Sequence, residues 1–487
     1  MIYRRLGVVI AAATLVAACG GTSATPTAPQ TTPAPGVATT APATVAPGGA
    51  TTAPATVAPG GATTAPATVA PGGATTAPAT AGGAPVTLTI ESWRSDDKAL
   101  WESKIIPAYE ATHPNITLVF APVLSTEYDN TLATRLQGGQ AGDLITCRPF
   151  DVSQGLYSKG YLTSLNDLPG MENYTPTVKS AWSTDDGSTT FCVPMASVIH
   201  GFFYNKDVFT RLNLTPPKTN ADFMSDLQAI KTDGKVAPLA LGVKDQWPVA
   251  LNGYYNIGPN FWKGEAGRYS IIMGTAKFTD PQFVAPFTQL TTWIPFLGNG
   301  YQAIGYSDAQ TLFELGKAAI NPAGSWDVPP FETALKTSLG WFAPPVQNAG
   351  DTCYQEDMID HAMGMNAASQ HPAEARQFLQ WVASADFETL YANAIPGFFP
   401  VINQSIKLDD PLAQQILDTR TACQGSLRLS YQFLSRGTPN LENDLWTESA
   451  AVMTGSATPD AAAQLIQTHL ASWYKPPSGF TPPSTAP

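Results

Sequence analysis

The globular part of the chain opens with short apolar runs that alternate with helical stretches. Residues 86–93 and 116–122 alternate apolar and polar side chains, as half-buried β-strands do. Between them, apolar residues recur at helical spacing over residues 96–113. A helix over residues 127–137 and a third strand over 143–147 continue the alternation. Strands separated by crossover helices predict an α/β fold with a mostly parallel sheet.

Two strand ends of this sheet carry aromatic and charged side chains. Trp93 and Arg94 close the first strand, Asp143 begins the third, and Arg148 follows it. In open α/β sheets, ligands sit beyond the carboxyl ends of the strands. We therefore predict that these four residues contact a ligand, with packing as the alternative role for Trp93 and a strand or helix cap as the alternative role for Asp143.

The length of the globular part predicts two lobes. Residues 86–480 have an ordinary globular composition, and a chain of that length exceeds what one compact core usually serves. The formal net charge of −12 comes without a cluster of Lys or Arg, which argues against nucleic acid and anionic lipid as partners. A neutral or cationic ligand fits this charge better.

The N-terminus predicts export and a lipid anchor. Arg4 and Arg5 precede a short apolar run that ends at Ala18, and residues 1–18 with Cys19 resemble a bacterial lipoprotein signal. We expect lipidation of Cys19. The alternative is an ordinary secretory signal with a chance cysteine near its cleavage site. Either signal exports the protein, and lipidation would hold it at the extracytoplasmic face of a bacterial cell membrane.

Residues 19–85 predict a tether. They consist almost entirely of Thr, Ala, Pro, Gly and Val, and one twelve-residue unit runs three times between residues 39 and 74. Such a segment lacks the apolar bulk that would offset the entropy cost of ordering its backbone. We expect it to be disordered, and we expect the same of residues 481–487.

Four cysteines remain in the globular part. Cys147, Cys192, Cys353 and Cys423 are an even number in a chain expected to be exported, so two disulfides are expected, with three pairings open. Their scatter and the isolation of the His residues do not match the spacing of zinc ligands. We expect no metal and no cofactor.

Three ordered segments resemble a known family. The first is residues 201–209 (GFFYNKDVF), and the second is residues 316–327 (GKAAINPAGSWD). The third comprises residues 363–369, a helix predicted over 372–384, and the turn 396–400 (PGFFP). These segments are similar to the family 1 extracellular solute-binding proteins, the sugar-type receptors of ABC importers related to maltose-binding protein.

The resemblance implies an α/β, two-lobed, periplasmic-binding-protein-like (type II) fold with a hinge and an interlobe cleft. Closure must be driven by contacts that the ligand makes to both lobes at once. The implied boundaries are an N-lobe of residues 86–197 plus 362–397 and a C-lobe of residues 198–361 plus 398–480, with chain crossings near 195–199, 357–361 and 398–401.

The resemblance and the positions of side chains point to five further ligand contacts. Trp326 stands after a glycine in a turn, where the family often has a stacking aromatic, and packing is its alternative role. Trp247, in a predicted loop, is a second candidate for stacking on the ligand. Phe398 is a candidate because it falls at an implied chain crossing. Glu356 and Asp357 are acidic candidates for sugar hydroxyls, although a hinge salt bridge explains them equally well.

Together these features predict a membrane-anchored, monomeric receptor that binds a mono- or oligosaccharide and presents it to an ABC permease without chemistry. The first alternative is the same fold binding a polyamine or another small solute. The second is a different class, an anchored glycoside hydrolase or an adhesin. The hydrolase has little support, because the chain lacks a Gly-x-Ser-x-Gly elbow, a His-Glu-x-x-His pair and a phosphate-binding glycine loop.

Overall fold

A computed structural model describes residues 84–478, 480 and 482. The predicted signal peptide, Cys19 and all but the last two residues of the predicted tether lie outside these residues, so their roles stay predictions. Within residues 84–478, no helix combines the length and the apolar composition that crossing a membrane requires.

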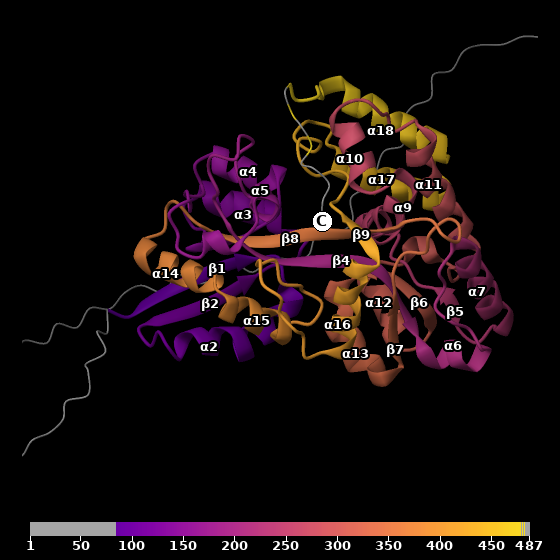
Figure 1. The fold of residues 1–487 in the computed structure, drawn as a ribbon, viewed down its shortest axis with the longest axis horizontal. Coiled ribbons are helices and arrows are strands. Elements are labelled where there is room, and N and C mark those ends of the chain that lie inside the picture. The colour runs from indigo at the N-terminus through magenta and orange to yellow at the C-terminus, as the bar shows by residue number, and fades with distance from the viewer. Residues whose placement is uncertain (1–83, 479, 481, 483–487) are drawn as a thin grey trace, which may run out of the picture. The chain divides into compact units, whose positions relative to one another are not determined.

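The centre of the fold is a nine-stranded sheet with the strand order β2-β1-β3-β8-β4-β6-β5 (Figure 1). In addition, β7 pairs with β4, and β9 pairs with β8. The strands are β1 (Val86–Ser92), β2 (Ile116–Pro122), β3 (Leu144–Cys147), β4 (Val193–Asn205), β5 (Ala237–Leu239), β6 (Ala318–Gly324), β7 (Leu339–Phe342), β8 (Cys353–Met365) and β9 (Cys423–Ser426). The bounds of β1, β2 and β3 confirm the three strands predicted from alternation.

The sheet is mixed, so the prediction of a mostly parallel sheet is wrong beyond β3. As expected for strands joined by crossover helices, β1 pairs in parallel with β2 and with β3. By contrast, β8 is antiparallel to both β3 and β4, and β4 is antiparallel to β6 and β7. The reason is that β8 inserts between β3 and β4 in the opposite direction, late in the chain.

The strands β4 and β8 each have 13 residues and run side by side between two hydrophobic cores (Figure 1). Val193 and Met195, near the start of β4, belong to a core that also contains Leu88 of β1. Phe202, near the end of β4, belongs to a second core that contains Leu290. We call the parts of the chain around these cores the N-lobe and the C-lobe. The residue boundaries given above stay a prediction.

Helices surround the sheet in both lobes. In the N-lobe they are α1 (Lys98–Leu100), α2 (Ile106–Glu110), α3 (Tyr128–Gln137), α4 (Asp151–Ser158), α5 (Pro176–Ser180), α14 (Pro372–Val382) and α15 (Ala385–Ala394). In the C-lobe they are α6 (Lys206–Leu212), α7 (Asn220–Asp233), α8 (Trp247–Val249), α9 (Pro259–Trp262), α10 (Glu265–Ile272), α11 (Pro281–Trp293), α12 (Tyr306–Glu314), α13 (Val328–Leu335), α16 (Pro411–Asp418), α17 (Leu441–Thr454) and α18 (Pro459–Trp473). The helix predicted over residues 96–113 is interrupted, because a π-helical turn at Trp101–Ile105 separates α1 from α2.

The segment 201–209 forms a strand-to-helix junction for a local reason. The side chain of Asn205, the last residue of β4, accepts hydrogen bonds from the backbone N–H groups of Asp207 (2.9 Å) and Val208 (3.3 Å). These bonds satisfy donors that the first turn of α6 would otherwise leave free. The Asn-Lys-Asp sequence therefore ends the strand and starts the helix at a defined residue.

The four cysteines of the globular part lie at two places in the sheet. A disulfide joins Cys353 to Cys423, which are also register partners at the starts of β8 and β9. Within the described residues, Cys147 and Cys192 are buried free thiols whose sulfur atoms lie 2.6 Å apart, so the prediction of two disulfides is wrong for this pair. Both flank Gly364 of β8, where an added Cβ would come within 3.1 Å of both sulfurs. A residue with a side chain would therefore crowd the two cysteines.

Candidate ligand-binding site

The turn that follows β6 presents an aromatic and acidic group. The indole of Trp326 packs on the cores of both lobes, and a Cβ on Gly324 would come 2.0 Å from it. The Trp326 N–H donates to the hydroxyl of Tyr306 at 2.8 Å. That hydroxyl donates to Asp327 Oδ1 at 2.6 Å, and the Gln310 amide donates to the same oxygen at 2.8 Å. The orientation of Trp326 is therefore set by hydrogen bonds as well as by packing.

The second oxygen of Asp327 is the unusual feature of this group. Asp327 is 2% exposed, and among the described residues its Oδ2 finds no hydrogen-bond partner. Burial raises the pKa of Asp327 to about 7, opposed by the hydrogen bonds from Tyr306 and Gln310. The charge of Arg94 lowers this pKa and that of Asp96 raises it. A buried acceptor without a partner is costly, so Oδ2 is the part of this group that the protein leaves unsatisfied.

Trp247 extends the aromatic surface of the C-lobe. It is half-buried, and its ring centroid lies 4.6 Å from that of Tyr306 with the planes tilted by 53°. Asp245 fixes this part of α12, because its carboxylate accepts the backbone N–H of Tyr306 at 2.7 Å. The structure thus brings two of the predicted residues, Trp247 and Trp326, against opposite parts of one tyrosine.

On the N-lobe side, Arg94 follows β1 and contacts Phe398 in the turn formed by residues 396–400. Its guanidinium forms an ion pair with Asp97 (2.5 Å) and lies 4.7 Å from the centre of the Phe398 ring. Burial alone would lower the pKa of Arg94, but the Asp97 carboxylate raises it above its usual value. Phe398 itself is fully buried, so it supports Arg94 from below rather than offering a free face.

Trp93 and Arg148 form a second contact at the same sheet edge. The Arg148 guanidinium lies 4.5 Å above the Trp93 ring and is paired with Asp129 at 2.9 Å. Trp93 is 6% exposed and also packs against Tyr128, with 5.5 Å between ring centroids. The structure therefore brings these two predicted residues together, although most of the Trp93 surface is used for packing.

The pair Asp360 and His361 on β8 connects these groups, and the sequence pattern did not single it out. The His361 ring lies 6.0 Å from Trp93 and 5.2 Å from Phe398. Its Nδ1 contacts Asp360 Oδ2 at 3.0 Å. Burial would raise the pKa of Asp360, but the bond to His361 and the charge of Arg94 help to lower it. Asp360 is therefore an ionised acceptor beside the sheet edge.

Glu356 and Asp357 have protein partners. Glu356 is 1% exposed and pairs with Arg428 at 3.0 Å, while its other oxygen lies 3.2 Å from His200 Nδ1 without hydrogen-bond geometry. Burial raises the pKa of Glu356 to about 7, and Arg428 opposes this shift. Asp357 pairs with Arg420 at 2.6 Å. Both carboxylates thus take part in ion pairs near the strands that join the lobes.

Asp143 does not join the other predicted residues. It precedes β3, whereas Arg148 follows it, so the two stand at opposite ends of the strand. Its carboxylate accepts the Thr89 backbone N–H at 3.0 Å and the Ser369 hydroxyl at 2.7 Å. Asp143 therefore links β1 to the turn after β8, which is the capping role named as its alternative.

The combined site offers aromatic faces, carboxylates and guanidinium groups from both lobes. Among the described residues, no three His, Cys, Asp or Glu side chains gather as metal ligands. The sequence pattern did not indicate a role in the site for Tyr306, Asp327 or Asp360. Asp327 follows Trp326 directly and could have been named with it, whereas Tyr306 and Asp360 reach the site only through tertiary contacts.

Solved structures of other proteins share this fold. The structure of a chitin oligosaccharide binding protein matches with a TM-score of 0.69 at 20% identity, covering 80% of this chain and 99% of that chain. RafE in complex with raffinose matches with a TM-score of 0.67 at 19% identity, covering 79% of this chain and 99% of that chain. These likenesses establish the two-lobed α/β fold that the resemblance implied.

Sequence comparison identifies the family. The multiple sugar-binding protein of Streptococcus mutans is 25% identical over 294 residues, which cover 58% of this chain and 67% of that protein. The melibiose/raffinose/stachyose-binding protein MelE of Bacillus subtilis is 26% identical over 156 residues, or 32% of this chain and 35% of that protein. The profile of the bacterial extracellular solute-binding proteins matches residues 91–388. The chain therefore belongs to the bacterial extracellular solute-binding protein family.

Proposed function

We propose that this protein binds a mono- or oligosaccharide between its lobes and presents it to an ABC permease without altering it. The observation that carries the proposal is the hydrogen-bonded group of Trp326, Tyr306 and Asp327, in which the Trp326 indole packs on the cores of both lobes. Aromatic faces stack on the C–H faces of a sugar ring, and desolvated carboxylates accept hydrogen bonds from its hydroxyl groups. The names of the relatives, which include two sugar-binding proteins, support a sugar over other solutes.

The proposed movement uses the two strands that connect the lobes. The register between β4 and β8 shifts on both sides of Ala196, so the ladder is irregular before β4 leaves the N-lobe core. We place the hinge there, with the nearby bridge between Ser197 and Phe399 as the third connection. A ligand that contacts Trp326 and Arg94 together would favour the closed arrangement, because neither lobe alone supplies both contacts.

We further propose that Cys19 carries a lipid, so that the receptor works at the outer face of the cell membrane. Replacing Cys19 with Ser should release the protein from the membrane fraction into the medium. Retention of the Cys19→Ser protein in the membrane would rule out the lipid anchor and leave the binding proposal intact.

A thermal-shift screen tests the ligand class. Raffinose, chito-oligosaccharides and a polyamine such as spermidine are added to the purified protein, since a ligand that binds only the folded state raises the melting temperature. We expect a sugar to raise it and to be recovered intact. Stabilisation by spermidine alone would replace the sugar with an amine, and recovery of cleaved sugar would make the protein a hydrolase.

A further inference from the structure

A short segment of the C-lobe is bonded to the N-lobe outside the candidate ligand site. We call residues 432–436 the clasp segment. Asp151, the first residue of α4, accepts the backbone N–H of Phe433 at its Oδ1 (3.0 Å) and that of Ser435 at its Oδ2 (3.2 Å). The Nε of Arg436 donates to the same Oδ1 at 2.7 Å. One carboxylate therefore receives three donors from the other lobe.

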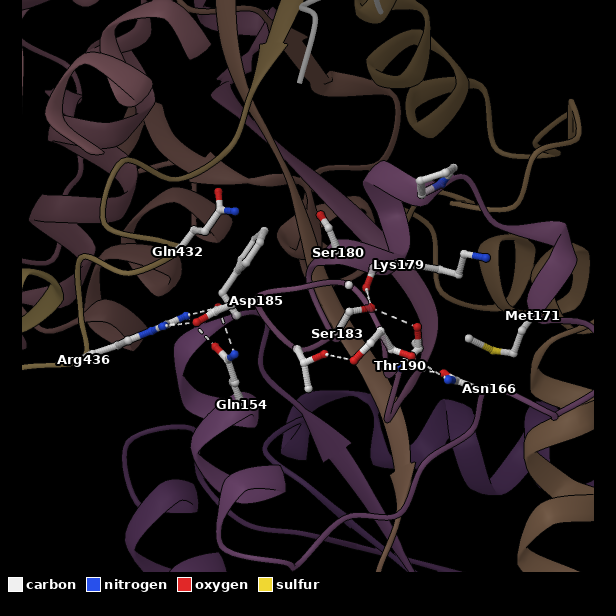
Figure 2. Close-up of a pocket in the computed structure, with 15 residues that line it drawn as sticks. Gln154, Asn166, Met171, Lys179, Ser180, Ser183, Asp185, Thr190, Gln432 and Arg436 are labelled. Atoms are coloured by element: carbon white, nitrogen blue, oxygen red, sulfur yellow. Dashed lines mark hydrogen bonds and ion pairs between the residues drawn. The ribbon is translucent and has the colours of Figure 1, made fainter. Parts of the chain in front are cut away.

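Arg436 makes further contacts with the N-lobe. Its two terminal nitrogens donate to the two carboxylate oxygens of Asp185, each at 2.7 Å, and one of them also donates to the Gln154 side chain (Figure 2). The Asp151 side chain is 6% exposed and that of Arg436 is 33% exposed. Paired donors from one guanidinium to one carboxylate are the stronger form of an ion pair. The clasp segment is thus anchored by ion pairs, one of them to the largely buried carboxylate of Asp151.

The clasp segment holds an unfavourable backbone conformation. Gln432 and Phe433 are successive non-glycine residues with φ values of 60° and 71°. Across the contact, Phe150 has a φ of 55° directly before Asp151. Residues other than glycine have a steric penalty at positive φ. Such a conformation persists only where surrounding contacts enforce it. The segment is held by its bonds to Asp151 and by the packing of Phe433 and Leu434 on the C-lobe core, and only the bonds to Asp151 would be lost if the lobes separated.

Apolar packing accompanies this attachment beside the clasp, where the ring centroids of Phe150 and Tyr431 lie 5.6 Å apart. A cavity of 540 Å³ opens beside the clasp and is lined by Gln432, Arg436 and mostly polar N-lobe residues such as Lys179, Ser183 and Thr190 (Figure 2). Trp326, Tyr306 and Asp327 lie outside this lining. The lobes are therefore joined here by hydrogen bonds and ion pairs as well as by this packing, at a place separate from the aromatic group of the candidate site.

We propose that Asp151 and Arg436 form a clasp that favours the closed arrangement of the lobes without a ligand and so sets ligand affinity from outside the ligand site. Affinity scales with the fraction of molecules in the binding-competent arrangement. A contact made only when the lobes are closed raises that fraction. Arg436 is in this sense a positioning residue. Its effect on closure is independent of the ligand, whereas its effect on affinity rests on the proposed function.

Hydrogen exchange of the ligand-free full chain tests the clasp directly. In Arg436→Ala and Asp151→Asn we expect the amides of the clasp segment to exchange at least about tenfold faster, because opening frees both donors. Arg376→Ala is the matched control, since Arg376 pairs with Asp167 at 2.9 Å inside the N-lobe and is 30% exposed. Equal exchange in wild type and Arg436→Ala would overturn the proposal, as would equal acceleration in the control.

Distance measurements separate opening of the lobes from local fraying. Spin labels introduced by Lys159→Cys and Lys277→Cys place one probe after α4 and one after α10, at exposed positions. We expect Arg436→Ala to add a population of different interlobe distance to the ligand-free protein, and Arg436→Lys to add less of it. An unchanged distribution in Arg436→Ala would reduce the clasp to a local loop contact and overturn its role in closure.

A titration with raffinose then tests the effect on affinity. We expect Arg436→Ala to weaken binding about tenfold and Gln432→Gly to tighten it, because glycine accepts the positive φ of the closed segment without penalty. Unchanged affinity in both variants would overturn the link to affinity. If raffinose fails to bind even the wild type, the choice of sugar is wrong, and the exchange and distance experiments still decide the clasp.

Discussion

The indole N–H of Trp326 donates to the Tyr306 hydroxyl at 2.8 Å, and this contact joins the turn after β6 to the start of α12. The Tyr306 hydroxyl in turn donates a hydrogen bond to Asp327 Oδ1. The aromatic face of Trp326 is therefore held in place before a ligand arrives. A binding surface that is already ordered loses less entropy on binding.

Replacing Trp326 with Ala should weaken sugar binding by on the order of 2 kcal/mol, or about thirtyfold in Kd, because a large aromatic contact is lost. Calorimetric titration with raffinose measures the change. Trp381→Ala is the control, since Trp381 packs against Tyr109 on the N-lobe side and should lower stability without changing Kd. An unchanged Kd in Trp326→Ala would remove Trp326 from the ligand site.

The raised pKa of Asp327 predicts a pH-dependent stability. Burial moves this pKa from 3.8 to about 7, so the folded state binds a proton more tightly than the unfolded state does. The free energy of unfolding contributed by Asp327 is then fully present below pH 4 and falls as the pH rises through 7, by on the order of a few kcal/mol.

Chemical unfolding of the wild type and of Asp327→Asn between pH 4 and 8 measures this effect. We expect the stability of the wild type relative to Asp327→Asn to decrease steadily over that range, since asparagine does not titrate. Parallel stability curves for the two proteins would show that Asp327 is not held with a raised pKa.

Arg428 should be indispensable for the stability of the folded chain. Its side chain is 7% exposed and pairs with both Glu356 (3.0 Å) and Glu442 (3.2 Å). Arg428→Met leaves two carboxylates without their partner and should cost about 3 to 5 kcal/mol in the free energy of unfolding. Arg420→Met, which breaks a pair with a 32% exposed arginine, should cost about 1 kcal/mol or less. Equal losses in the two variants in urea unfolding would contradict this assignment.

The Cys353–Cys423 disulfide should stabilise the C-lobe. It links residues 70 positions apart, so removing it by Cys353→Ser and Cys423→Ser should cost about 2 to 4 kcal/mol in the free energy of unfolding. A reductant should lower the urea midpoint of the wild type to that of the double variant and leave the variant unchanged. If the reductant lowered the urea midpoint of the double variant equally, the loss of stability in the wild type would not come from breaking this disulfide.

Local sequence features predicted much of the fold because they act over a few residues. Side-chain alternation defined β1 and β2 to within a residue, and Asn205 marks the junction of β4 and α6. The family segments were recognisable for the same reason, and Trp326 was named from the turn that contains it. The direction of β8 was not predictable, because pairing with β3 and β4 depends on where the chain returns after more than a hundred residues.

The sequence by itself determined the first three strands and the helices between them, the family, and the types of side chain available for a ligand. The tertiary structure decided which of them meet. Asp143 bonds to β1 and a turn, Asp327 is bonded to Tyr306, and Arg436 reaches Asp151 from 285 positions away. Periodicity and capping are local properties, whereas a site between two lobes is assembled by chain crossings whose partners no short pattern encodes.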